Sequence, residues 1–209
     1  LPDLGHREPD WKPSPGYAEL MAGLLDVEDQ TVLALALDAL ALAEPRAEPD
    51  ILPVLERIVM APSSKRDVRA AALKTLLRHL GARPETGPAV AGLFRNACRR
   101  FSGGLAEVGI DEAVQSTPGT VRLELFRHAL ALDLDPDDAE WVGWLFGQLP
   151  EDDGWKLILE SLPKLDTPGK RSALLGRMGA KELTKSPAGL DFLRSVATDS
   201  RLDIYVRLN

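Results

Sequence analysis

A stretch of ~36 residues recurs near the start of the chain, and this repeat constrains the fold more than any other feature. Residues 31–40 align with residues 67–76, with apolar or small residues at matching positions. The pairs are Val32 with Val68, Ala34 with Ala70, Ala36 with Ala72, Leu37 with Leu73, and Leu40 with Leu76. Such an offset is typical of helical hairpins. One hairpin cannot bury both of its apolar faces, so hairpins stack and share a core.

Helical periodicity covers the rest of the chain. Leu and Ala supply 61 of the 209 residues, and both enter a helix at little entropic cost. Strand-like alternation of polar and apolar residues is not seen, so we expect an all-α protein. The expected helices begin near residues 17, 28 and 50. Further helices are expected over residues 66–80, 86–101, 105–114, 118–130, 137–149, 153–162, 173–178, 187–196 and 199–208.

Several residues mark helix boundaries. Gly81 is expected to cap the C-terminus of the helix over 66–80, and Thr117 to cap the N-terminus of the next regular helix, with Pro118 as its first residue. Near the end of the chain, one apolar stripe is expected: Leu190, Leu193 and Val196.

A third copy of the second helix of the repeat is predicted near residue 121. Val121 and Arg122 match Val68 and Arg69. The spacing to this copy is longer than ~36 residues, so the helix over 86–101 is expected to be an insertion.

The segment from Asp67 to Leu76 (DVRAAALKTL) resembles the second helix of a HEAT repeat. The resemblance implies a right-handed α-solenoid of four or five stacked antiparallel helical hairpins, regular over residues 17–81 and divergent over 82–209, with an irregular C-terminal half. Asp67 and Arg69 match the paired charges that form ladders between repeats of that family. Thr31 and Leu33 break the ladder in the first repeat. Armadillo-like repeats are a related alternative. The family carries no general catalytic residues.

Charge and composition disfavour nucleic-acid binding, a membrane span and an internal disulfide. The net charge is -7 and the pI about 5.1, which disfavours nucleic acid as a partner. No apolar run approaches the ~20 residues of a membrane span, and a single cysteine, Cys98, excludes an internal disulfide. Residues 1–16 hold four prolines and are expected to form an extended tether of an excised or processed domain. A cytoplasmic location is expected, with the periplasmic part of an anchored protein as the alternative.

Candidate binding residues lie on two predicted helix surfaces. Asp38, Lys74 and Arg78 are expected on the exposed side of second helices, where they contact a protein partner. A basic patch suits a phosphate or an acidic peptide, although a solvated helix face beside Glu107 is the simpler interpretation; it consists of Arg95, Arg99 and Arg100. Cys98 is expected to be a small buried residue. Four late aromatic residues are expected in the core rather than at an interface: Trp141, Trp144, Phe146 and Trp155.

No metal, cofactor or catalytic site is predicted. His79 and His128 have no second histidine at a zinc spacing, and His6, Glu8 and Asp10 lie in the tether. We therefore expect a non-catalytic protein-interaction or scaffolding module without a cofactor. Two alternatives stay open. One is a HEAT-like enzyme of DNA-alkylation repair or chromophore lyase type. A DNA glycosylase needs aromatic residues and an acidic residue, and the chain has these types in Trp141, Trp144 and Asp153. The other is a regulatory solenoid arm of a signalling ATPase or sensor.

Overall fold

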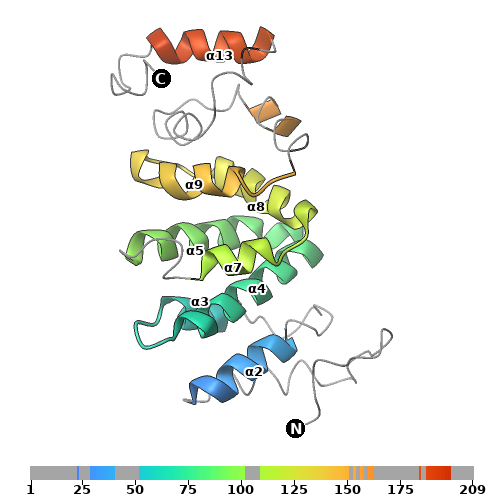
Figure 1. Ribbon diagram of the computed structural model, residues 1–209, viewed down its shortest axis with the longest axis vertical. Helices are drawn as coiled ribbons and strands as arrows, with labels where there is room; N and C mark the ends of the chain where they lie inside the picture. Colours follow the sequence, from blue (N-terminus) through green and yellow to red (C-terminus); the bar gives the residue numbers. More distant parts are fainter. Residues whose placement is uncertain are drawn as a thin grey trace.

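A computed structural model describes residues 23, 29–40, 52–101, 109–150, 153, 156–157, 160–161, 184 and 187–198. Every regular element of these residues is helical, which confirms the all-α class. The α-helices are α2 (Gln30–Leu40), α3 (Leu52–Met60), α4 (Arg66–Ala82), α5 (Gly87–Arg100), α7 (Ile110–Gln115), α8 (Gly119–Ala131), α9 (Ala139–Phe146) and α13 (Pro187–Thr198). Short 3-10 helices cover Pro84–Thr86 (η1) and Pro136–Asp138 (η2). Figure 1 shows the helices from α2 to α9 one above another along the long axis.

Some predictions fall outside the described residues. They concern the tether over 1–16, the helix before residue 28 and the helix start at Asp50. They also concern Glu107, Trp155, and the helices over 173–178 and 199–208.

Helices α2 and α4 lie side by side and run in the same direction. The Asp29 carboxylate caps α2 by accepting hydrogen bonds from the backbone N–H groups of Thr31 (2.8 Å) and Val32 (3.2 Å). At the start of α4, the Lys65 N–H donates to Gln30 Oε1 at 3.2 Å. Further along, the Thr75 hydroxyl donates to the Leu37 carbonyl oxygen at 3.3 Å. The contacts advance together along both helices, so the two helices are parallel.

Arg69, one of the two residues that resemble the HEAT charge ladder, is buried at the turn between α3 and α4. Its Nη2 donates to the carbonyl oxygens of Ala61 (3.2 Å) and Pro62 (3.3 Å), beyond the last turn of α3. Its guanidinium lies 4.1 Å from the centre of the Phe101 ring, which places the end of α5 against the start of α4. Arg69 therefore ties its own hairpin to the next helix, while Asp67 points to solvent with its side chain 87% exposed.

Gly81 is not a C-cap, contrary to the prediction. Helix α4 continues through Gly81 to Ala82, and Arg83 follows as the cap residue. A Cβ at Gly81 would lie 2.8 Å from Cγ2 of Val121 on α8. The glycine is needed for close approach of two helices, and a sequence pattern does not separate this role from helix termination.

Helix α8 does not take the place of a further second helix of the repeat. It packs on α5, and α5 packs on α3, so α3, α5 and α8 form one row, here called the first row. Helix α2 packs on α4 and α4 packs on α7, so these three helices form the second row. The sequence predicts an inserted helix at residues 86–101, but α5 takes a regular place beside α3. The element that follows α4 in the second row is the short α7.

Two contacts show where α5 meets the end of α8. Gly87, at the start of α5, has the His128 ring of α8 against it. Further along, Arg95 Nη1 donates to the Asp133 carbonyl oxygen at 3.0 Å. These contacts place the start of α5 against the last turn of α8, and the middle of α5 against the residues that follow α8. Thr117 does not cap α8: its hydroxyl donates to the Ala113 carbonyl oxygen at 2.7 Å, and Pro118 is the cap residue.

The core runs between the two rows. Repeat positions 36/72, 37/73 and 40/76 are buried in both copies. This burial agrees with the alignment of residues 31–40 with residues 67–76. Trp141 is buried, as predicted, while Trp144 and Phe146 are half-buried and pack against the core. On α13 the buried residues include Phe192 and Val196. Leu190 is 38% exposed, which corrects its predicted place on the apolar stripe.

Candidate interaction surface

The second row carries the three residues predicted to face a partner, and the structure separates them. Asp38 on α2 and Arg78 on α4 are exposed. Lys74 is not on the open side of its helix, because α7 lies beside it. Its Nζ donates to Glu112 Oε1 at 3.0 Å, and its side chain is only 30% exposed. The prediction that Lys74 lies on the open side of its helix is therefore wrong. The sequence pattern around Lys74 gives no sign that α7 packs on α4.

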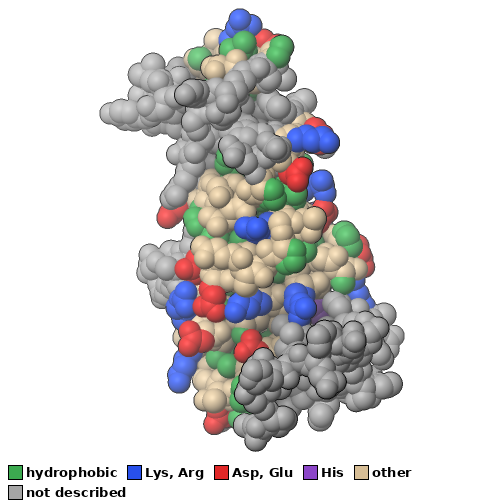
Figure 2. Space-filling model, turned by 45° about the vertical axis from the view of Figure 1, so that its right-hand side comes forward, with side chains coloured by type: hydrophobic (Ala, Val, Ile, Leu, Met, Phe, Trp, Pro, Cys, Tyr) green, Lys and Arg blue, Asp and Glu red, His purple; other side chains and the backbone are tan. Residues whose placement is uncertain are grey.

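A charge cluster joins α4 to α7. Arg66 contacts Asp111 at 3.2 Å and Glu112 at 3.1 Å, in addition to the pair between Lys74 and Glu112. The Lys74 hydrogen bond, followed by the contribution of Arg66, lowers the pKa of Glu112 below its ordinary value. Figure 2 shows acidic and basic side chains intermingled at the height of these helices. The cluster fastens α7 in place, so most of its charge is compensated within the molecule.

The predicted basic patch on α5 is also largely compensated. Arg99 donates from Nε and Nη2 to the two carboxylate oxygens of Asp138, at 3.0 and 2.8 Å, and contacts Asp135 as well. These bonds, led by those to Asp138, raise the pKa of Arg99. Asp138 is fully buried and also accepts from the Trp141 indole N–H at 3.3 Å. The pair therefore clamps α5 to the start of α9.

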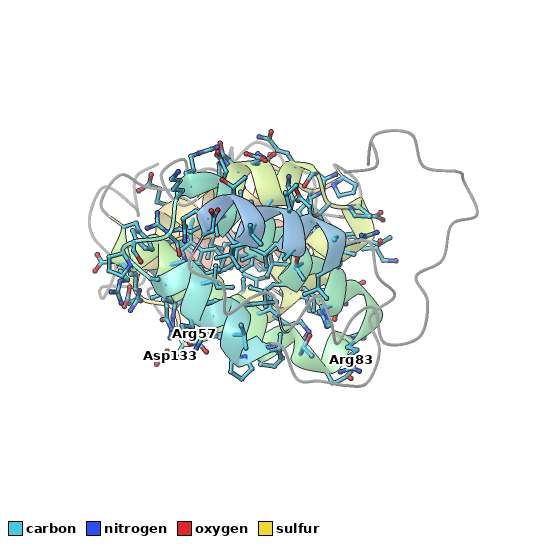
Figure 3. The ribbon with its side chains drawn as sticks, turned by 90° about the horizontal axis from the view of Figure 1, so that it is seen from below. Arg57, Arg83 and Asp133 are labelled. Carbon is cyan, nitrogen blue, oxygen red and sulfur yellow. The ribbon has the colours of Figure 1, made fainter. Side chains whose placement is uncertain are left out.

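The other two members of the patch differ from Arg99. Arg95 bonds the Asp133 backbone, as described above, and is half-buried, whereas Arg100 is exposed at the end of α5. Figure 3 shows Arg57 of α3 and Asp133 at one margin of the molecule, and Arg83 at a separate place. The surface of the first row thus carries charges of both signs, and the structure does not bring Arg95, Arg99 and Arg100 together as a free anion site.

The surroundings of Cys98, His79 and His128 are those of residues that pack within the fold. Burial, together with the charges of Asp138 and Glu140, raises the pKa of the Cys98 thiol to about 12, so the thiol stays protonated. His79 is buried, and the His128 ring lies 3.1 Å from Glu124. Among the residues that the structure describes, no three His, Cys, Asp or Glu side chains group as metal ligands. None of the described helices combines the length and apolar character needed to cross a bilayer.

The charge contacts have a signal in the sequence that residue-by-residue reading misses. Residues 52–101 hold ten Lys or Arg against three Asp or Glu, whereas residues 109–150 hold two against eight. A basic block followed by an acidic one predicts attraction between the elements they form. Pairing of single residues within the blocks depends on which helices become neighbours.

No family model, curated protein or solved structure matches this chain.

Proposed function

We propose that this chain is a non-catalytic protein-interaction module, built as a HEAT-type α-solenoid of stacked helical hairpins. The observation that carries the proposal is the parallel, side-by-side packing of α2 and α4, with α7 next to α4 in the same row. A row of helices offers a broad surface to which several elements each contribute a few side chains, as binding surfaces of repeat proteins do.

Charge pairing within the molecule favours a protein over a nucleic acid as the partner. Nucleic-acid binding depends on cations that can neutralise phosphates. In this chain Arg66, Lys74 and Arg99 are already bonded to carboxylates. A protein partner instead needs shape fit and a few complementary charges, and the side chains of Asp38 and Arg78 are exposed on neighbouring second-row helices.

The test is a capture experiment with matched charge reversals. The baits are the unmodified chain, Asp38→Lys, Arg78→Glu and, as control, Glu56→Lys on first-row helix α3, where Glu56 is also exposed. We expect a protein that binds the unmodified chain and the control alike and binds the two second-row variants about tenfold more weakly. Equal binding to all four baits would refute the second-row surface. Salt-sensitive retention of DNA alone would favour the enzyme alternative.

A further inference from the structure

We draw no further inference here: the strongest candidate, the half-buried Arg122 beside Gly119 at the start of α8, whose buried Nε has no hydrogen-bond partner among the described residues, carries nothing because it is a single, partly exposed arginine at a helix N-terminus and no second observation shows which ligand would bind it.

Discussion

Single residues decide how the helices of this molecule are fastened. Asp138 is fully buried and accepts four hydrogen bonds, two from Arg99, one from the Trp141 indole and one from the Asp135 backbone N–H. A buried carboxylate is stable only with such partners. Neither its burial nor its link to Arg99 follows from the sequence, where Asp138 is one of several acidic residues after α8.

Removing the Asp138 charge should destabilise the fold. Asp138→Asn leaves Arg99 with one carboxylate fewer. We expect the free energy of unfolding to fall by about 2 kcal/mol, which is less than the loss caused by removing one partner of a fully buried ion pair. The pair is partly screened, because the Arg99 side chain is 38% exposed. Urea denaturation measures the change. The exposed neighbour Asp137→Asn is the control, with an expected change within about 0.5 kcal/mol. Equal effects of the two variants would contradict the clamp.

Two glycines on neighbouring helices should respond oppositely to alanine. Gly81→Ala places a Cβ 2.8 Å from the stiff Val121 side chain, so we expect destabilisation of about 1–2 kcal/mol. A Cβ added to Gly92 on α5 would meet no neighbouring atom within 4 Å, so Gly92→Ala should stabilise the helix by about 0.5–1 kcal/mol. Thermal unfolding compares the two. Adding Val121→Ala should reduce the penalty of Gly81→Ala, and full additivity would argue against a steric cause.

Among the elements, α7 shows how a short helix is held by both apolar and charged contacts. It has only six residues, but Ile110, Ala113 and Val114 are buried at 1% exposure or less. Glu112 adds the ion pairs to Arg66 and Lys74. An isolated helix of this length is unstable in water, so packing on α4 decides its existence.

The ion pairs of α7 should make stability depend on pH in the acidic range. The pKa of Glu112 is lower in the folded chain than its ordinary value of 4.5. Its stabilisation is therefore present above about pH 4.5 and is lost as the pH falls through the lower folded pKa. We expect the urea midpoint of Glu112→Gln to fall less steeply than that of the unmodified chain below this pH. Parallel curves would show that the pairs contribute nothing, as many exposed pairs do.

At the scale of the whole molecule, α4 is the central element. It packs against α2, α3, α5, α7 and α8, and its buried residues lie on nearly all sides. We expect its central amides, such as those of Leu73 and Leu77, to exchange with deuterium last, since they open only with the whole stack. Native-state hydrogen exchange followed by NMR tests this. Slower exchange in α8 than in α4 would place the most stable part of the stack elsewhere.

The sequence alone determined the helical class, the repeat register over residues 31–40 and 67–76, the positions of α3, α4 and α5 to within a few residues, and the core place of Trp141. These follow from periodicity and composition, which act over one or two helical turns. The tertiary structure alone decided that α8 joins the first row, that Gly81 serves close packing, that Lys74 is covered by α7, and that Arg99 is bound to Asp138. Each of these depends on which helix faces which, and helices with similar apolar stripes become distinguishable only when their surfaces meet.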